Sequence, residues 1–305
     1  MYYLFSRKFS LFIQLIFVSL LIGSSVFSQS VTQPDQKASP TPQQSPSPSV
    51  EHSFFKNILR DQRAIWTAPF AAEKNDVRWI MPLAATSAVL FATDRHTAGE
   101  LAEPGDHHAR LEVSKDISEL GSLYATAGIA GAFYVVGRGT NNPRARETGI
   151  LGLEALIDTG IVTSAIKVGS QRPRPTVDDA SGEFYDKGSS FPSGHSASIW
   201  SLATVVSCEY GRHRPLVQVA AYGAATAVSV ARYTGQNHFL SDVVIGSAIG
   251  FGVGRYVYRT HHDPTLDTED SSSKSQRTHS RWIPVASPTY SRSARVYGLK
   301  SQWIF

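Results

Sequence analysis

Two residues in the second half of the chain, His238 and Asp242, have the types and spacing of a catalytic pair. They are four positions apart where a helix is predicted to begin, which places their Cβ atoms about 5–6 Å apart on one helical face. A carboxylate there can accept the Nδ1–H of the imidazole, fix its tautomer and leave Nε2 with a lone pair. The chemistry would be nucleophilic or general base catalysis. The alternative is a helix-start histidine beside a capping aspartate.

A second histidine closes the sequence Pro192-Ser193-Gly194-His195, which opens an apolar helix. Proline suits the first turn, where its missing N–H leaves no bond unmade. The backbone N–H groups of Ser193 and Gly194 then point beyond the helix end, where donors and dipole together favour an anion such as phosphate. Gly194 has no side chain to keep that anion away. An ordinary capped helix start would have the same sequence.

Three cations accompany these residues. Lys167 ends a predicted helix, Arg174 follows in a turn stiffened by two prolines, and Arg232 ends the helix before His238. Arginine offers two parallel donors to phosphate oxygens, and lysine adds a compact positive charge. We therefore expect these three cations to hold a phosphate group, and Arg172 to lie on a solvated basic loop.

Considered together, these groups resemble the three-part signature of the type 2 phosphatidic acid phosphatase and vanadium haloperoxidase superfamily. Both the order of the three parts and the spacings within them agree with that signature. The matching positions are Lys167, Arg174-Pro175, Pro192 to His195, Arg232, His238 and Asp242. The chain departs from the family's pattern at Ala231, where a serine is usual, and this removes one hydroxyl near the site.

The resemblance implies a helical bundle that hydrolyses a phosphate ester through a phosphohistidine. It assigns His238 as the nucleophile, Asp242 as the residue that orients it, and His195 as the acid that protonates the leaving oxygen. The groups that would hold the phosphate oxygens are Lys167, Arg174, Arg232 and the backbone of Ser193 and Gly194. The implied substrate is a lipid phosphate, a lipid diphosphate or another phosphomonoester.

The resemblance implies neither a metal nor another cofactor, and vanadate is expected to inhibit by occupying the phosphate site. Two other functions remain open. In a vanadium-dependent haloperoxidase, vanadate would be the cofactor, although the body is short for that role. A catalytically silent envelope protein of the same fold is the other, and the complete set of two histidines, one aspartate and three cations argues against it.

The composition limits the remaining classes. Hydrophobic residues make up 42% and charged residues 18% of the 305, so a sizeable core is possible. A net charge of +4 is too small to indicate a nucleic-acid partner, and none is expected. Cys208 is the only cysteine, which excludes an intrachain disulfide and a cysteine-rich metal site.

The N-terminal segment has the pattern of an export signal. Residues 1–28 combine Arg7 and Lys8, an apolar run and a small-residue cleavage site, and are predicted to be a signal peptide or an anchor. Residues 29–50 are rich in proline, serine and glutamine and are predicted to be a disordered linker. The expected location is the periplasm or the cell envelope, with the body held by the N-terminal segment if that segment is retained.

Residues 51–259 are predicted to form the all-α catalytic domain, and residues 260–305 a polar, flexible tail whose end could pair as a hairpin. Pro82 and the small residues within 76–93 predict a helix of modest length there, followed by a polar stretch over 97–110 with Pro104-Gly105 as its breaker. The later helices are predicted at 122–136, 148–167, 196–209, 215–231 and 240–258. Their apolar runs are shorter than the roughly 20 residues that cross a bilayer, so we expect a soluble bundle, with a peripheral or partly embedded form as the alternative.

Overall fold

A computed structural model of the chain describes residues 50–71, 76–102, 108–177, 181–212, 214–267, 281–291 and 296–304. The predicted signal segment and all but the last residue of the predicted linker lie outside these ranges. The chain divides into two compact units, Met1–His262 and Asp263–Phe305, and each is treated by itself.

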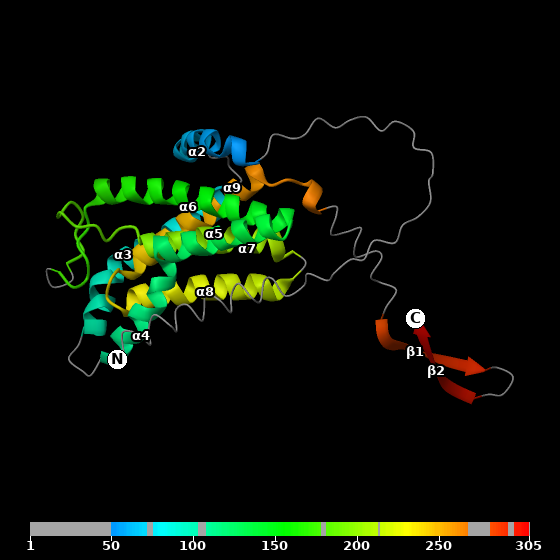
Figure 1. The fold of residues 1–305 in the computed structure, drawn as a ribbon. Helices are drawn as coiled ribbons and strands as arrows, with labels where there is room; N and C mark the ends of the chain where they lie inside the picture. Colours follow the sequence, from blue (N-terminus) through cyan, green and yellow to red (C-terminus); the bar gives the residue numbers. More distant parts are fainter. Residues whose placement is uncertain are drawn as a thin grey trace, which may run out of the picture. The chain divides into compact units, whose positions relative to one another are not determined.

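Every element described in the first unit is helical, which confirms the predicted all-α body. Its α-helices are α2 (Val50–Thr67), α3 (Val77–Ala102), α4 (His108–Ser118), α5 (Leu123–Gly139), α6 (Pro143–Ser170), α7 (Gly194–Tyr210), α8 (Pro215–Thr234) and α9 (Leu240–His261). Two 3-10 turns, η1 (Ala68–Ala71) and η2 (Glu119–Gly121), join them. Figure 1 shows α5, α6, α7 and α8 running side by side along the body.

The second unit contains a two-stranded antiparallel sheet. Strand β1 (Arg281–Ser291) pairs with β2 (Val296–Ile304), and Tyr290 lies opposite Tyr297 next to the turn. The sequence did not decide whether this segment forms a hairpin, and in the structure its two strands pair.

The helix α3 is longer than predicted. It has 26 residues and contains Pro82 in its second turn. A proline at that position removes one backbone hydrogen bond without ending the helix. The polar residues beyond Thr93 also remain helical, and there His96 and Glu100 form an i,i+4 pair at 3.2 Å. The predicted stop was wrong because polar residues were taken as a break instead of as an exposed helical face.

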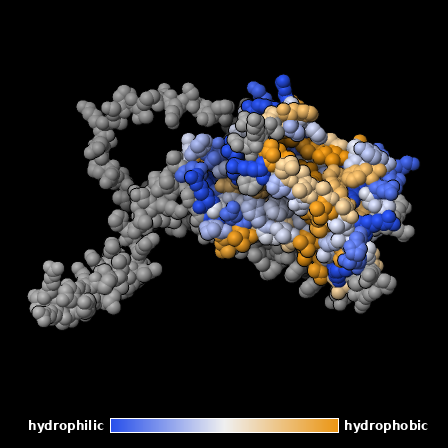
Figure 2. Space-filling view, turned by 180° about the vertical axis from the view of Figure 1, so that it is seen from behind, coloured by the Kyte–Doolittle hydropathy of each residue, from blue (hydrophilic) through white to orange (hydrophobic). Residues whose placement is uncertain are grey.

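Two further helices correct the expectation of a soluble bundle. The helices α6, with 28 residues, and α9, with 22, are long and apolar enough to cross a membrane, and the bent pair of α4 and α5 would add a third span if it acts as one. Counting only uninterrupted apolar runs missed these lengths, because both helices continue through polar residues. Figure 2 shows apolar residues, in orange, gathered in broad patches on one face of the body. These features fit a membrane-associated protein.

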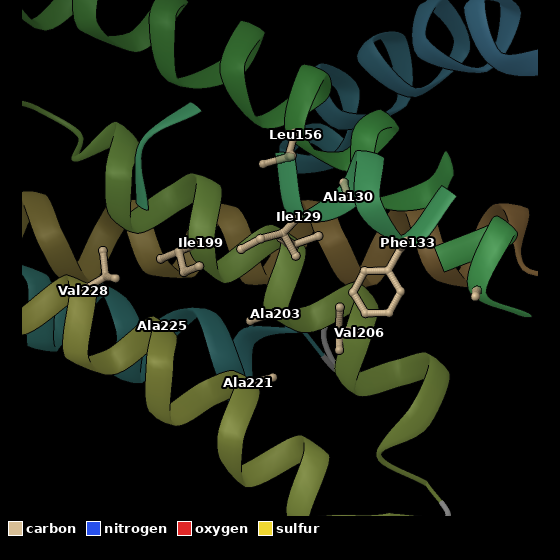
Figure 3. Packing of buried hydrophobic residues seen from close by; sticks show 12 residues of the cluster. Ile129, Ala130, Phe133, Leu156, Ile199, Ala203, Val206, Ala221, Ala225 and Val228 are labelled. Carbon is tan, nitrogen blue, oxygen red and sulfur yellow. The ribbon is translucent and has the colours of Figure 1, made fainter. Parts of the chain in front are cut away.

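The core lies around α7, which packs against α5, α6, α8 and α9. Small and branched apolar side chains dominate it, and Figure 3 shows how those of α7 interleave with those of its neighbours. The buried cluster consists of Ile129, Ala130, Phe133, Ala145, Leu156, Ile199, Leu202, Ala203, Val206, Ala221, Ala225 and Val228. Burial of each large side chain of this kind contributes about 1.5–3 kcal/mol.

Three glycines of α9 at four-residue spacing let α7 and α9 approach with their backbones nearly in contact. A Cβ on Gly246 would lie 2.5 Å from the Ser193 carbonyl oxygen, and one on Gly250 would lie 2.1 Å from that of Ala197. Gly254 meets the next turn of α7 in the same way. No side chain fits at these distances, so the glycines fix the separation between the N-terminal ends of the two helices.

We expect Gly250→Ala to destabilise the protein by about 1–3 kcal/mol, because the added methyl group forces α7 and α9 apart. Gly252→Ala is the matched control, since a Cβ there meets nothing within 4 Å. That variant should be unchanged or slightly more stable, by up to about 1 kcal/mol of helix propensity. Thermal unfolding of the purified variants in detergent measures both. Equal unfolding temperatures would contradict a contact set by the glycines.

Candidate active site

The predicted site residues come from the ends of four helices. Lys167 lies in the last turn of α6 and Arg232 in the last turn of α8, while Asp242 lies in the first turn of α9. Ser193 is the N-cap of α7, and Gly194 and His195 are its first two residues. Arg174 lies in the segment between α6 and α7, and His238 in the short turn between α8 and α9.

The pair of His238 and Asp242 is buried, with 3% and 0% of their surfaces exposed. His238 Nδ1 lies 3.6 Å from Asp242 Oδ2, and the Ser190 hydroxyl lies between them, 3.3 Å from Nδ1 and donating to Oδ2 at 2.5 Å. His238 precedes the helix N-cap, Phe239, so the two do not share a helical face as predicted. The Asp242 carboxylate accepts the Phe239 N–H at 3.0 Å, which keeps the preceding residue, His238, close to that carboxylate.

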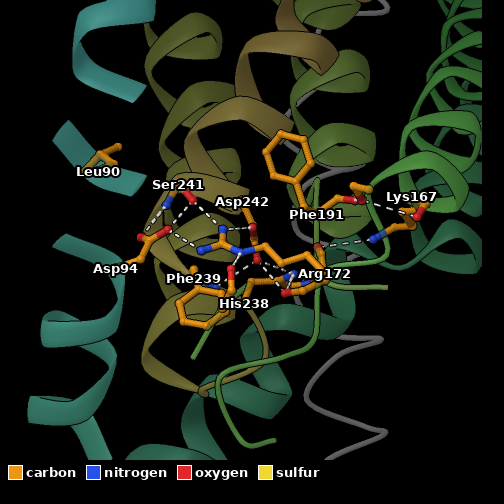
Figure 4. Close-up of polar contacts among 12 residues, drawn as sticks. Leu90, Asp94, Lys167, Arg172, Phe191, His238, Phe239, Ser241 and Asp242 are labelled. Carbon is orange, nitrogen blue, oxygen red and sulfur yellow. Dashed lines mark hydrogen bonds and ion pairs between the residues drawn. The ribbon is translucent and has the colours of Figure 1, made fainter. Parts of the chain in front are cut away.

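Arg172 is a buried part of this site and not the solvated loop residue that was predicted. Only 2% of its surface is exposed. Its Nη1 donates to Asp242 Oδ1 at 2.7 Å and its Nη2 to Asp94 Oδ2 at 2.9 Å, while Nε donates to the Gly182 carbonyl at 2.9 Å. The guanidinium thus joins α3 to the start of α9, as Figure 4 shows.

Aromatic rings enclose this guanidinium. Its central carbon lies 4.1 Å from the centroid of the Phe239 ring, and the rings of Phe184 and Phe91 are 5.2 and 5.4 Å away. The rings exclude water and interact with the cation through their negative faces. An ion pair in such surroundings is strongly directional, and its loss would leave buried carboxylates without a cation.

Sequence reasoning missed Asp94, Ser190 and Ser241. Asp94 accepts the Ser241 backbone N–H at 3.2 Å and also its hydroxyl. Its other partner, Arg172, is 78 positions away in the chain, so no local spacing indicates the contact. Ser190 could have been noticed, because it lies directly before the Phe-Pro-Ser-Gly-His sequence.

The N-terminal end of α7 presents its backbone toward Lys167. The Ser193 side chain caps the helix by accepting the Ser196 N–H. The Ser193 backbone N–H, predicted to hold phosphate, instead donates to the Asp242 carbonyl at 3.0 Å. A Cβ placed on Gly194 would meet only Lys167 Cε, at 3.8 Å. The first turn of α7 is therefore open on the side of the lysine, as an anion site at a helix N-terminus requires.

The three cations are held differently. Lys167 Nζ donates to the Ser189 carbonyl at 2.7 Å, whereas Arg174 is exposed. Arg232 is 7% exposed, with one weak bond from Nη1 to the Ser118 hydroxyl at 3.4 Å. Its buried Nε has no partner among the residues that the structure describes. Within the described parts of the chain, neither Arg174 nor Arg232 is paired with a carboxylate, so both have donors for an anion.

The charges act on one another across the site. The pKa of His195 is lowered to about 4. Burial is the main cause, and the charges of Arg232, His238, Arg174 and Lys167 act in the same direction. Burial likewise lowers the pKa of His238 to about 4 against the opposing effect of Asp242. Burial and Arg174 also lower the pKa of Arg232 to about 10. Both histidines are therefore neutral near pH 7, and the site has an excess of positive charge that a phosphate dianion would neutralise.

The donor set around His238 does not fit a metal ion. Both oxygens of Asp242 and at least one of Asp94 already accept bonds from Arg172 or its neighbours. Among the residues described, the groups of histidines and carboxylates close enough for a metal lie elsewhere, around His261 and His262.

We expect Arg172→Gln to lower the free energy of unfolding by about 3–5 kcal/mol, because it leaves Asp94 and Asp242 buried without their cation. Arg174→Gln removes an exposed charge and should change stability by less than about 0.5 kcal/mol. Denaturant unfolding of the two variants compares a buried arginine with an exposed one from the same segment. Similar losses from both would show that Arg172 is not the buried link described above.

Comparisons with known proteins agree with this arrangement. Residues 149–265 match the family model of the PAP2 superfamily. The chain is 29% identical over 186 residues to a lipid A 1-phosphatase of Porphyromonas gingivalis. The matched residues make up 61% of this chain and 38% of that protein, so the match spans well under half of the relative. It also resembles the crystal structure of a transmembrane PAP2 type phosphatidylglycerolphosphate phosphatase from Bacillus subtilis, at 19% identity and a TM-score of 0.42 over 76% of this chain and 98% of that one. Residues 149–265, which include His195, His238 and Asp242, are thus similar to the PAP2 superfamily.

Proposed function

We propose that this protein hydrolyses the phosphate ester of a membrane lipid through a phosphohistidine formed on His238. The observation that carries the proposal is the neutral, buried imidazole of His238. Its Nδ1 faces Asp242 and Ser190, and the charges of Arg232 and Lys167 are close enough to act on the imidazole. A neutral imidazole held in this way has its Nε2 lone pair available for attack on phosphorus.

In the first step, His238 Nε2 forms a bond to phosphorus while the bond from phosphorus to the lipid oxygen breaks. The imidazole becomes positively charged, and the Asp242 carboxylate beside Nδ1 stabilises that charge. Arg172 keeps Asp242 ionised and in place, because its guanidinium donates to the same carboxylate. Ser190 holds the second oxygen of Asp242 and completes the support.

The leaving oxygen needs a proton, which we assign to His195. This residue is neutral in the free site at pH 7 because its pKa is about 4. A phosphate monoester has a second pKa of about 6, so its monoanion can bring the proton into the site. Once bound, the negative phosphate offsets the cations around His195 and raises the pKa of the imidazole, which then holds the proton for the leaving group.

In the second step, His195 has given up its proton and serves as the base. It removes a proton from water, the oxygen attacks phosphorus, and the bond to His238 Nε2 breaks to release inorganic phosphate. Lys167, Arg174, Arg232 and the first turn of α7 would neutralise the phosphate oxygens in both transition states. In this mechanism, cations and backbone donors replace the metal ions that many phosphoryl-transfer enzymes use.

A lipid substrate is favoured by two observations. The matched relative acts on lipid A according to its name, and α6 and α9 are long and apolar enough to place the site at a membrane. We further propose that the body lies outside the cytoplasmic membrane, because the N-terminal segment has the pattern of an export signal. A haloperoxidase activity and a catalytically silent role have no specific observation in their favour.

A phosphate-release assay on the purified full chain tests the activity. We expect turnover of a lipid monophosphate or diphosphate, with lipid A, phosphatidic acid, phosphatidylglycerol phosphate and undecaprenyl diphosphate as the lipids tried and glycerol phosphate as the soluble comparison. Initial rates measured well below the unfolding temperature should survive EDTA, and vanadate should inhibit competitively. Turnover of glycerol phosphate alone would exclude a lipid enzyme, and dependence of the initial rate on an added metal would overturn the mechanism.

The pH dependence tests the roles of the two histidines. We expect kcat/KM for a lipid monophosphate to fall as the pH drops through about 4, because protonation removes the lone pair of His238. It should also fall above about pH 6, where the substrate loses the proton it brings to His195. His195→Gln should slow turnover by about 10²–10⁴-fold. A kcat/KM that keeps rising through pH 7 in the wild type would contradict the proton assignment.

A further inference from the structure

A second group of buried ionisable residues lies far from the active site, where α2, α6 and the C-terminal end of α9 meet. It consists of Asp61, Glu154 and His261, whose ligand atoms all lie within 4.8 Å of one another. Asp158 follows on the same face of α6, one turn beyond Glu154. Glu154 is 13 residues before Lys167, or about 20 Å along the axis of α6. Figure 1 shows α2 beside α6 at this part of the body.

The charges of this group do not balance. Asp61, Glu154 and Asp158 are each fully buried, with 0% of their surfaces exposed. Facing them are the imidazole of His261 and the exposed Arg60, whose Nη2 lies 3.3 Å from His261 Nδ1. The other neighbours are neutral donors: Gln62 donates to Asp158 Oδ1 at 2.8 Å, and Tyr256 to Asp61 Oδ1 at 3.3 Å. Burying three carboxylates beside one imidazole is costly unless protons or a further positive charge are supplied.

Oxygen atoms remain without hydrogen bonds in the middle of the group. Neither carboxylate oxygen of Glu154 has a hydrogen bond of good geometry among the described residues, although the Asn57 and Asp61 side chains are close enough to act on it. Asp158 Oδ2 has no hydrogen-bond partner there either. Glu154 Oε1 lies 3.3 Å from His261 Nε2, and Asp61 Oδ2 lies 2.7 Å from the same nitrogen. Asp61, Glu154 and His261, from three helices, thus place metal-ligating atoms around one buried point.

We propose that Asp61, Glu154 and His261 form a divalent-cation site that fastens α2 to α6 and α9. Carboxylate oxygens with one imidazole nitrogen suit Zn²⁺ best, with Mn²⁺ as the second choice. Ligands about 2.1 Å from a tetrahedral Zn²⁺ are about 3.4 Å apart, close to the 3.3 Å between Glu154 Oε1 and His261 Nε2. Asp61 Oδ2, which lies 2.7 Å from the same nitrogen, would move outward when the ion binds. When Nε2 binds the ion, Nδ1 carries the ring proton, and the exposed Arg60 rotates away from it.

A neighbouring group provides an internal comparison. His262 contacts Glu147 at 3.1 Å and Glu209 at 3.5 Å, and Arg144 lies 3.9 Å from the second oxygen of Glu209. Two carboxylates there face two basic side chains, so the charges can balance without an ion. The group around His261 has one more carboxylate, and its second basic residue, Arg60, is exposed to water. Because both oxygens of Glu209 also lack hydrogen bonds among the described residues, the charge balance is what distinguishes the two groups and favours a cation at His261.

Metal binding and thermal unfolding of the full chain in detergent test this site. After EDTA treatment and dialysis, we expect one equivalent of Zn²⁺ to bind, as measured by elemental analysis, and Zn²⁺ at 100 times its Kd to raise Tm by about 5–10 °C. Glu154→Gln should lose the bound zinc and the rise in Tm. Without metal it should unfold at a higher temperature than the wild type, because a buried charge is removed. Phosphate release well below Tm should be the same with and without zinc, since the site is remote from His238.

Glu147→Gln is the matched control, because it removes a buried carboxylate from the balanced group of the same helix and should keep the zinc-dependent rise. If Glu154→Gln does not fold, Asp61→Asn provides the same comparison from α2. Absence of stoichiometric zinc and manganese binding by the wild type would overturn the proposal and indicate that the group shares protons instead. Zinc binding that persists in both Glu154→Gln and Asp61→Asn would equally overturn it.

Discussion

The buried contact of Arg172 with Asp242 and Asp94 is the interaction on which the catalytic end of this protein depends. One guanidinium donates to carboxylates from α9 and α3 at 2.7 and 2.9 Å, inside a ring of phenylalanines. It neutralises the aspartate that faces His238 and at the same time fixes where α9 begins. Because a buried charge without its partner is strongly unfavourable, the chain has little freedom to place Asp242 anywhere else.

A second constraint aligns this network with the phosphate site. Gly246 and Gly250 let the α9 backbone lie against Ser193 and Ala197 of α7, where no side chain would fit. The Ser193 N–H donates to the Asp242 carbonyl across the same contact. The first turn of α7, where we propose that phosphate binds, and the first turn of α9, which carries Asp242, are therefore set at a fixed distance by backbone packing. The side chains only need to complete the geometry.

The sequence was informative where the relevant residues are close together or follow a known pattern. The helical body, the starts of α7, α8 and α9, and the chemistry of His195, His238 and Asp242 could all be inferred from local spacing and the family resemblance. Contacts between distant residues could not. Arg172 resembled a solvated loop residue because both of its carboxylates lie far away in the sequence, and nothing local indicates that Asp94 is buried.

The prediction that no helix is long enough to cross a bilayer was wrong for a related reason. Glu154 and Asp158 interrupt the apolar pattern of α6 and made its apolar run look too short to cross a bilayer, although both are buried and the helix continues through them. The same residues form the group around His261. Polar residues that shorten an apolar run in the sequence can therefore mark a buried polar site in the structure, and only the partners from other helices distinguish the two cases.

Rapid-quench trapping of the phosphorylated enzyme tests the central claim most directly. Labelled lipid phosphate is mixed with the full chain, the reaction is stopped in alkali, where phosphohistidine is stable, and the labelled peptide is identified by mass spectrometry. The account predicts label on Nε2 of His238, none in His238→Ala, and much less in Arg172→Gln even at temperatures where that variant is folded. Label on His195, or undiminished turnover by His238→Ala, would contradict it.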